Sequence, residues 1–382
     1  MIGNPPYIDS ETMTNVMPEL RETYASLYAT AKGNWDMFVI FIELGMRLCA
    51  INGIYSFIIP NKLIAAKYTE TLRKKLETEQ LIEIRDYSRL PVFSNAAVYP
   101  CTIVCKHSEI EKNNKTKFVV MNELTTAKSK NLISKTIFDT CSYWDVFFRD
   151  EVEFNIICKF LSNSVVKEKY TVIGSATVSE AYKIKEILFD KEDIDVDSVK
   201  VINTGTIDPY ECLWGKKPMQ YIKGKYDFPR VKITDLKNMN PKRVEQAKSE
   251  KLIIAGMSSQ IEAVYDKGNI LGGKSTTIVL GNNLKYLLAL LSSKLSTFCI
   301  NILYNSLKMA GGYLNIGTRE IEDFPLPNAT DETICNLENI VDKIIENKEN
   351  GTDTKSLEDS LNTIICNAYG LSPSEIQILE KK

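Results

Sequence analysis

The chain opens with Met1-Ile2-Gly3-Asn4-Pro5-Pro6-Tyr7, and this stretch decides the fold that the sequence predicts. Pro5 and Pro6 fix the backbone angle φ and favour an extended conformation for the residue before each of them. The side-chain oxygen of Asn4 and the carbonyl oxygen of Pro5 are therefore held in place as two hydrogen-bond acceptors. Tyr7 follows directly and offers an aromatic face. The turn is expected immediately after a strand.

Two acceptors beside an aromatic ring suit the transfer of a methyl group to a planar nitrogen. The exocyclic amine of adenine is a poor nucleophile because its lone pair is delocalised into the ring. If Asn4 and Pro5 each accept one hydrogen of that amine, its lone pair is aimed at an electrophilic methyl group. No strong base is needed, since positioning and electrostatics supply most of the rate. The alternative is an ordinary proline turn near a terminus.

The residues that follow predict an α/β domain. After Gly33-Asn34-Trp35-Asp36, the apolar residues from Met37 to Leu48 recur at intervals of three and four, as on the buried face of a helix. Asn52-Gly53 predicts a turn into residues 54–60, a continuous apolar run that favours a strand buried on both faces. Two further β-rich segments extend from Leu81 to Tyr87 and from Val98 to Cys105.

In this order, the motifs resemble the Taq-type N6-adenine DNA methyltransferases, including fused restriction-modification enzymes that carry a C-terminal specificity domain. The resemblance implies an α/β fold: the C-terminal half of a Rossmann-like methyltransferase sheet, then a mixed α/β target-recognition domain and a helical tail. It implies catalytic roles for Asn4, Pro5, Pro6 and Tyr7. It also implies S-adenosylmethionine as the methyl donor and double-stranded DNA as the partner.

The resemblance further places Phe93 in a hairpin loop whose aromatic residue packs against the flipped adenine. Stacking between Tyr7 and Phe93 is then expected to hold the base in the pocket. The alternative for Phe93 is a loop anchor that folds onto its own hairpin.

The second half of the chain resembles the recognition domain of the same family. The matching stretches, in order, include residues 173–177, 201–210, 214–215 and 324–327. Ser372-Pro373-Ser374-Glu375 predicts the capped start of a last short helix. The resemblance does not place residues from about 106 to 165. We therefore expect a partial methyltransferase domain over 1–108, a linker over 109–165, a DNA target-recognition domain over 166–327 and a helical segment over 328–382.

The distribution of charge predicts where DNA binds. The net charge is only −2, but the stretch from Lys216 to Lys251 contains eleven Lys or Arg against four Asp or Glu, with aromatic residues interleaved. The alternative is a solvated face with no DNA contact. The candidate phosphate ligands are Lys216, Lys217, Lys223, Lys225, Arg230 and Lys232.

The cofactor site is expected to lie mostly outside this chain. Nucleotide-binding sheets hold the cofactor on a Gly-rich turn after the first strand, and only three residues precede Asn4. We expect a C-terminal fragment, a truncated product or one part of a split enzyme, with an N-terminal half or partner chain that carries the cofactor site. Alone, such a chain is expected to be inactive and not to bind S-adenosylmethionine.

Composition argues against several other classes. Nine scattered cysteines and a single histidine support neither a zinc cluster nor a disulfide framework, so no metal is expected. With no signal peptide and no apolar run of membrane-spanning length, a cytoplasmic protein is expected.

Two alternative functions are also compatible with the sequence. One is a non-catalytic DNA-binding specificity module, and the other is a protein methyltransferase acting on a glutamine amide, which uses the same tetrapeptide.

Overall fold

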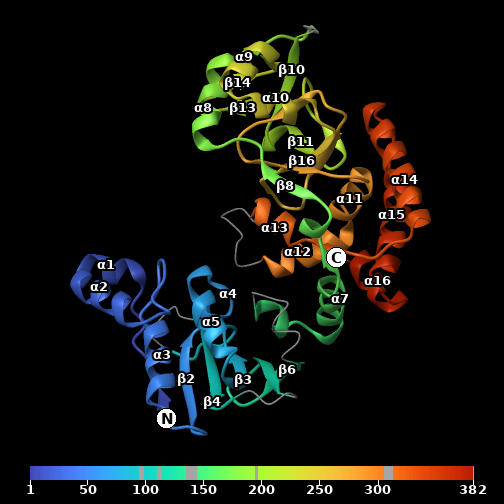
Figure 1. Cartoon of the computed structure of the whole chain (residues 1–382). Helices are drawn as coiled ribbons and strands as arrows, with labels where there is room; N and C mark the ends of the chain where they lie inside the picture. The colour runs from blue at the N-terminus through green and yellow to red at the C-terminus, as the bar shows by residue number, and fades with distance from the viewer. Residues whose placement is uncertain (94–98, 110–113, 135–143, 194–196, 305–312, 382) are drawn as a thin grey trace. The chain divides into compact units, whose positions relative to one another are not determined.

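The computed structural model describes residues 1–382 except 94–98, 110–113, 135–143, 194–196, 305–312 and 382. The chain divides into two compact units, Met1–Leu161 and Ser162–Lys382 (Figure 1). The first unit contains the Asn-Pro-Pro-Tyr turn, and the second contains the basic stretch. The mixed α/β character that the sequence predicts is confirmed.

The first unit is built on a six-stranded sheet with the order β1-β2-β4-β3-β5-β6. β1 is parallel to β2 and β5 is parallel to β3, whereas β4 lies antiparallel between β2 and β3. In β2, Tyr55, Phe57 and Ile59 are buried, whereas Ser56 and Ile58 between them are only half-buried, so the second face of the strand is covered less completely than the sequence predicts. The strands are β1 (Ile2–Gly3), β2 (Ile54–Pro60), β3 (Gln80–Asp86), β4 (Pro100–Lys106), β5 (Lys115–Met121) and β6 (Ala127–Ser134).

The structure differs from the expected linker over residues 109–165. Here β5 and β6 extend the sheet, and η2 (Trp144–Phe148) and α7 (Glu151–Leu161) follow. The ring of Phe118 in β5 packs against the rings of Trp144 and Phe147, with centroids 6.2 and 4.9 Å apart. All three side chains are buried. Because large aromatic residues gain most when they leave water, these rings contribute to the core of the first unit. The described residues up to Leu161 belong to that unit, and Ser162 to Val165 belong to the second.

The helix that the sequence predicts after Trp35-Asp36 is α3 (Phe38–Leu48), which packs against β2. A Cβ atom on Gly45 of α3 would lie 2.6 Å from the ring of Phe57, so glycine is required where helix and sheet meet. The other helices of this unit are α1 (Ser10–Val16), α2 (Pro18–Leu27), α4 (Lys62–Ala65), η1 (Lys67–Thr69) and α5 (Glu70–Leu76).

Glu43 is a buried carboxylate in α3 that ties the helix to its surroundings. It accepts hydrogen bonds from the backbone nitrogen and hydroxyl of Thr30 at 2.9 and 2.8 Å. Arg47 and Lys75 donate to it at 2.6 and 3.1 Å. Burial by itself raises the pKa of the Glu43 carboxyl, but the hydrogen bonds from Thr30, Lys75 and Arg47 outweigh it and lower the pKa from 4.5 to about 2.

We expect the first unit to lose stability in acid because of Glu43. A lowered folded-state pKa stabilises the fold above about pH 4.5, and this contribution is lost as the pH falls towards about 2. The shift corresponds to about 3 kcal/mol. Urea unfolding between pH 6 and pH 3 measures the effect, and Glu43→Gln should flatten the pH dependence. The exposed Glu19→Gln is the control. A Glu43→Gln protein with unchanged acid sensitivity would contradict this assignment.

The second unit contains two four-stranded sheets, β19-β10-β15-β9 and β18-β16-β20-β8. The strands of the first are β9 (Leu188–Asp190), β10 (Ser198–Ile202), β15 (Pro229–Lys232) and β19 (Ile270–Gly272). Those of the second are β8 (Thr171–Gly174), β16 (Lys251–Ala255), β18 (Ala263–Asp266) and β20 (Thr276–Leu280). The short pairs are β7 (Ser164–Val165) with β22 (Pro325–Leu326), β11 (Ile207–Asp208) with β12 (Glu211–Cys212), β13 (Met219–Tyr221) with β14 (Gly224–Tyr226), and β17 (Met257–Ser258) with β21 (Leu314–Asn315).

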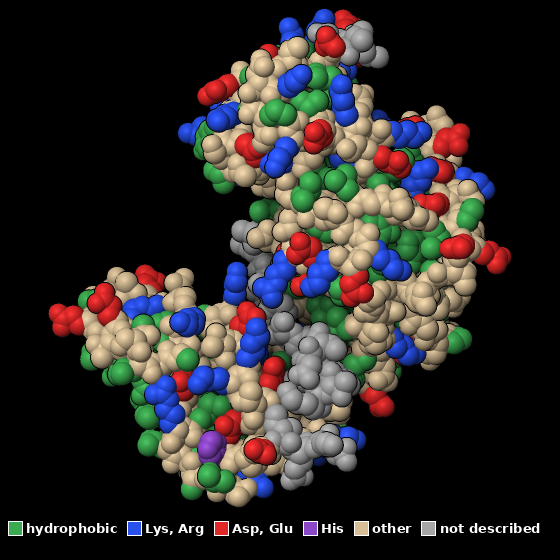
Figure 2. Space-filling model, in the orientation of Figure 1, with side chains coloured by type: hydrophobic (Ala, Val, Ile, Leu, Met, Phe, Trp, Pro, Cys, Tyr) green, Lys and Arg blue, Asp and Glu red, His purple; other side chains and the backbone are tan. Residues whose placement is uncertain are grey.

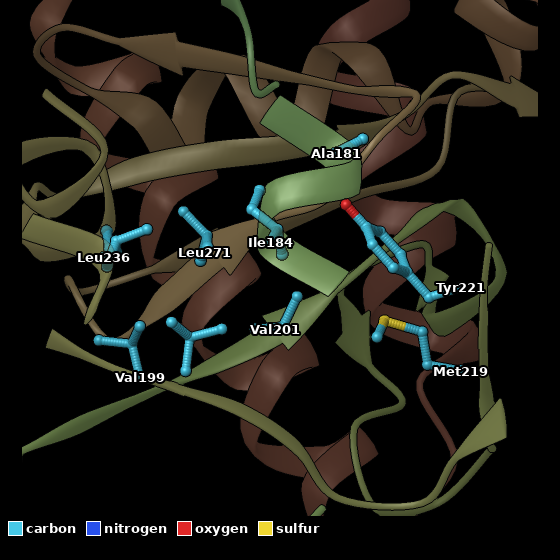
Figure 3. Close-up of a cluster of buried hydrophobic side chains, with 10 residues drawn as sticks. Ala181, Ile184, Val199, Val201, Met219, Tyr221, Leu236 and Leu271 are labelled. Carbon is cyan, nitrogen blue, oxygen red and sulfur yellow. The ribbon is translucent and has the colours of Figure 1, made fainter. Parts of the chain in front are cut away.

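Helices surround these sheets and form the end of the chain. Beside the first sheet, α8 (Val178–Ile187), α9 (Ile233–Met239) and β13 contribute side chains to a buried apolar cluster (Figure 3). The described helices further along are α10 (Pro241–Lys248), α11 (Leu284–Leu291), α12 (Lys294–Leu303), α13 (Thr318–Glu322), α14 (Asp331–Glu349), α15 (Lys355–Ala368) and α16 (Pro373–Glu380), and the 3-10 helices are η3 (Val166–Glu168) and η4 (Thr204–Thr206).

The C-terminal helices pack onto the second unit. α14 contacts α11, and the hydroxyl of Tyr369, the C-cap residue of α15, donates to the carbonyl of Pro325 at 2.7 Å. α16 begins with Ser372 as its N-cap and a capping box with Glu375, as the sequence predicts. The helices α14, α15 and α16 thus make up most of the described residues after 330 and belong to the second unit.

Within the described ranges, no single helix has the length and hydrophobicity needed to span a membrane. The bent pair α11 and α12 meets those criteria only when its two helices are taken together. Leu287, Leu288, Leu290 and Leu291 of this pair are fully buried inside the second unit.

Candidate functional site

The Asn4-Pro5-Pro6-Tyr7 turn follows the C-terminal end of β1 and leads towards α1. Gly3 at the end of β1 lies opposite Phe57 of β2, and a Cβ atom on Gly3 would be 2.6 Å from the Phe57 ring. Glycine therefore lets β1 lie close to β2. The turn leaves the sheet at the C-terminal end of two parallel strands, which is where ligands bind in open α/β sheets.

Three hydrogen bonds fix the residues that follow the prolines. The hydroxyl of Tyr7 donates to the carbonyl of Ile58 in β2 at 3.1 Å. The backbone nitrogen of Met37 donates to the carbonyl of Ile8 at 2.9 Å. The backbone nitrogen of Ser10 donates to Oδ1 of Asp36 at 3.1 Å. The turn is thus held both by β2 and by the segment before α3.

Asp36 links this turn to the next part of the chain. It is buried, and its Oδ2 accepts hydrogen bonds from Nζ of Lys62 and from the hydroxyl of Tyr68, both at 2.8 Å. Burial, together with the hydrogen bond to Asp36, raises the pKa of the Tyr68 hydroxyl well above its ordinary value. In the sequence, Asp36 stands out only as part of the stretch that leads into a helix. No spacing in the sequence pointed to Lys62 or Tyr68.

Asn4 and Pro5 carry the two oxygens whose acceptor role is a prediction from the sequence. Pro5 is buried, whereas Asn4 is exposed. Within the described part of the chain, neither the Asn4 side chain nor the Pro5 carbonyl makes a hydrogen bond. Among the described residues, neither oxygen is thus engaged in a hydrogen bond, and the residues that follow in the turn are fixed.

Tyr7 and Phe93 lie together, with ring centroids 5.9 Å apart and an angle of 81° between the ring planes. This is an edge-to-face contact. A base stacked between two parallel rings needs about 7 Å between them, twice the carbon–carbon contact distance. The rings must therefore move apart before a base can enter between them. The loop residues 94–98 that follow Phe93 are outside the described residues.

The hydroxyl of Tyr7 does not act as a base near neutral pH. Burial, with a smaller effect of the neighbouring Cys101, raises the pKa of Tyr7 to about 12. The hydroxyl is therefore protonated, which agrees with its role as a hydrogen-bond donor to Ile58.

In the second unit, most of the predicted phosphate ligands are exposed. Lys216 forms an ion pair with Glu211 at 2.8 Å. Basic and acidic side chains alternate over the visible face of the part that carries α8, α9 and β14 (Figure 2). The exposed candidates are Lys216, Lys217, Lys223, Lys225 and Lys232.

Arg230 corrects the sequence prediction, because its side chain is only 3% exposed. Its Nε donates to the carbonyl of Lys191 at 3.0 Å, and its guanidinium lies 4.8 Å from the ring centroid of Trp214. Position 230 lies in β15, and the count of charges ignored which face of that strand is buried. Arg243 and Lys251 of the same stretch are also committed to carboxylates, those of Glu180 and Asp266.

A pocket of roughly 600 Å³ lies at the opposite end of the first sheet from the turn. Its lining includes His107, whose Nδ1 lies 3.0 Å from both carboxylate oxygens of Glu79. Among the described residues, no group of three or more side chains has the arrangement of a metal site.

The sequence of the first unit matches a known family. The sequence model of the family described as Eco57I restriction-modification methylase matches residues 1–93. The type II restriction enzyme and methyltransferase RM.Eco57I of Escherichia coli is 24% identical over 180 residues, which is 47% of this chain and 18% of that protein. The chain thus contains an Eco57I-like restriction-modification methylase region, and it spans less than a fifth of this relative's length.

Several solved structures are similar to this chain at low identity and low TM-score. The type IIL restriction-modification enzyme MmeI in complex with DNA is 12% identical with a TM-score of 0.44, and the match covers 100% of this chain and 56% of that one. The type IIG restriction endonuclease BpuSI is 13% identical with a TM-score of 0.38, and the match covers 97% of this chain and 54% of that one. At these TM-scores, the likenesses support no conclusion about the site.

Proposed function

We propose that this chain is the catalytic-motif and target-recognition part of a site-specific DNA methyltransferase in a restriction-modification system. The proposed reaction transfers a methyl group from S-adenosylmethionine to N6 of adenine. One observation carries the proposal: the free oxygens of Asn4 and Pro5 lie on an anchored turn beside the rings of Tyr7 and Phe93. All four residues fall within the segment that matches the methylase family.

The chemistry follows from the two acceptors. S-adenosylmethionine, when bound, supplies an electrophilic methyl group. Oδ1 of Asn4 and the carbonyl oxygen of Pro5 each accept one hydrogen of the N6 amine, which fits an amine that carries two hydrogens. This arrangement orients the nitrogen lone pair towards the methyl donor without a general base. Tyr7 contributes its ring, because its hydroxyl is protonated and engaged with Ile58.

The described residues supply little of a cofactor site. No described strand of the first unit is followed by a Gly-x-Gly turn into a helix, the element that holds nucleotide cofactors in related sheets. β2 is the only described strand that pairs with β1, and Ile2 in β1 is exposed. We propose that cofactor-binding strands, from an N-terminal half or a partner chain, pair along the free edge of β1.

Base capture gives a test of the site. The rings of Tyr7 and Phe93 are proposed to separate and to hold the flipped adenine. Tyr7→Ala and Phe93→Ala should each weaken or alter the fluorescence enhancement of 2-aminopurine placed at the target adenine, with unchanged far-UV circular dichroism. Tyr7→Phe is the matched control, because it keeps the ring and removes only the hydrogen bond to Ile58. An unaffected Phe93→Ala variant would make Phe93 a loop anchor.

DNA binding by the full chain should depend steeply on salt. Each phosphate contacted makes the slope of log affinity against log salt more negative by about 0.9, so contacts from the exposed Lys216, Lys217, Lys223 and Lys232 give a slope of up to about −3.6. Replacing Lys216, Lys217 and Lys223 together by alanine should reduce the slope by about 2.7. Lys355→Ala, an exposed lysine in α15, is the control and should change nothing. Salt-independent binding would remove the basic stretch from the interface.

Binding and methyl-transfer assays on the same protein distinguish the alternative functions. A non-catalytic specificity module would bind DNA and transfer no methyl group, even with S-adenosylmethionine and the cofactor-binding part supplied. A protein methyltransferase would methylate a glutamine-containing peptide in place of duplex DNA. Transfer of labelled methyl groups to duplex DNA is the outcome expected here.

A further inference from the structure

The β13–β14 hairpin of the second unit has one buried face and one exposed face. Met219 and Tyr221 point into the apolar cluster that Figure 3 shows, and both are buried. Because successive side chains of a strand point to opposite faces, Gln220 points away from the cluster. Lys225 lies directly opposite Gln220 across the hairpin, and both side chains are exposed.

The exposed face is surrounded by positive charge along the chain. Lys223 occupies the turn of the hairpin, and Lys216 and Lys217 come just before β13. All three are exposed, and the sequence contains no Asp or Glu between Glu211 and Asp227. A polar pair flanked by lysines is a surface suited to nucleic acid.

The hairpin is held firmly from beneath. Nδ2 of Asn203 donates to the carbonyl of Gln220 at 2.6 Å. A Cβ atom on Gly273 would lie 3.0 Å from the ring of Tyr221, so the ring packs directly on the glycine backbone. A surface fixed in this way loses little conformational entropy when it binds a partner.

The turn of the hairpin carries backbone strain. Ile222 and Lys223 have φ angles of 41° and 62°. A two-residue turn with positive φ at both positions strongly favours Asn-Gly, and a β-branched residue there is an outlier. Strain of this kind concentrates at functional sites. Here the strained position at the tip of the hairpin is occupied by Lys223, although glycine would adopt this positive φ without strain.

We infer that the exposed face of the β13–β14 hairpin enters the major groove of DNA, where Gln220 and Lys225 read base edges. This inference rests on the proposed DNA-binding function. The major groove admits a two-stranded β-ribbon, in which glutamine pairs with the N6 and N7 atoms of adenine and lysine with the O6 and N7 atoms of guanine. Lys216, Lys217 and Lys223 contact phosphates, which position the ribbon without reading sequence.

The spacing of the pair fits this role. Side chains directly opposite each other across a hairpin have Cβ atoms about 5 Å apart. Successive bases along one DNA strand are separated by about 3.4 Å. The two long side chains of Gln220 and Lys225 therefore reach neighbouring base pairs.

Selection from a library of random DNA duplexes, using the full chain, tests the inference. The wild-type protein should enrich a sequence motif. Gln220→Ala should lose the base preference at one position of the motif and Lys225→Ala at another, each by roughly fivefold to a hundredfold. Lys216→Ala should weaken binding to all sequences alike and leave the motif unchanged. Lys355→Ala should bind as the wild type does.

Two results would overturn the inference while leaving DNA binding intact. In one, the wild-type chain binds duplexes but enriches no motif. In the other, Gln220→Ala and Lys225→Ala both keep the wild-type motif. Because both positions are exposed, unchanged thermal unfolding shows that each variant is folded. A wild-type chain that binds no duplex at any salt concentration would instead refute the proposed function, and the inference with it.

Lys223→Gly adds a measurement in which stability and binding move in opposite directions. Glycine relieves the positive φ, so the unfolding temperature should rise. The loss of one phosphate contact should reduce the salt slope of DNA binding by about 1. A variant with the wild-type slope would overturn the placement of the turn on DNA.

Discussion

Replacement of Asn4 by alanine should slow methyl transfer by about a hundredfold or more, since one preorganised polar contact to the reacting group has an effect of this size. Duplex affinity should hardly change, because the Asn4 side chain bonds no residue that the structure describes. The measurement is single-turnover transfer of a labelled methyl group by an enzyme that contains this chain together with its cofactor-binding part. Duplex affinity is measured in parallel.

The control for Asn4 is another asparagine close to it in the sequence. Asn15 is exposed in α1, so Asn15→Ala should leave both rate and affinity unchanged. If Asn4→Ala instead lowers rate and affinity by the same factor, Asn4 is a structural residue of the turn. That result would also remove the observation on which the proposed function rests.

Replacement of Asp266 by asparagine should destabilise the second unit by about 3 to 5 kcal/mol, because it leaves a buried ammonium group without its carboxylate. Lys251 is completely buried, and its Nζ donates to Asp266 and to the carbonyls of Ala247 and Ser249. The Asp266 carboxylate also accepts from the backbone nitrogens of Asn269 and Ile270, at 3.0 and 3.1 Å. Denaturant unfolding of the full chain measures the loss.

The stability of the Asp266→Asn variant should depend on pH, and the pKa of Lys251 gives the direction of that dependence. Burial lowers the pKa of the Lys251 ammonium even in the wild-type protein, while Asp266 opposes that shift. Without Asp266, the folded state releases this proton more readily than the unfolded chain, in which lysine titrates near pH 10.4. The unfolded state then binds more protons, so the stability of the variant should rise as the pH is raised from about 7 towards 10.

An exposed ion pair is the matched control for Asp266. Lys285 and Asp342 are 2.6 Å apart, and Asp342 is exposed. Asp342→Asn should cost less than about 1 kcal/mol, because exposed pairs contribute little. Equal effects of the two substitutions would show that the Lys251 and Asp266 pair is no more important than a surface contact.

Some elements follow from short stretches of sequence alone. Ser372, Pro373 and Glu375 form the predicted N-terminal cap of α16, since every contact in that cap lies within four residues. Asn52 adopts a φ of 65° in the turn that precedes β2, as Asn-Gly predicts. The helical spacing after Asp36 likewise gives α3. In each case the decisive interactions are local, so contacts with distant parts of the chain do not alter the predicted element.

Charge counting failed where burial decides the role of a side chain. Arg230 belongs to the most basic stretch of the chain, yet β15 turns it inwards onto Trp214. Residues 109–165 read as a linker because no motif identifies them, although Phe118 and Trp144 form part of a core. Neither the burial of Arg230 nor the packing of Phe118 can be predicted from the local sequence, because each depends on a contact with a residue at least 16 positions away.

The sequence by itself determined the α/β class and the helices and strands whose signals are local, whereas the acceptor role of Asn4 and Pro5 stays a prediction. Only the tertiary structure decided the strand order, the hydrogen bonds of Asp36 with Lys62 and Tyr68, and the edge-to-face contact of Tyr7 with Phe93. The physical reason is the separation along the sequence between the residues that interact. Caps, turns and periodicity depend on neighbours within a few residues, whereas these contacts join residues 26 to 86 positions apart.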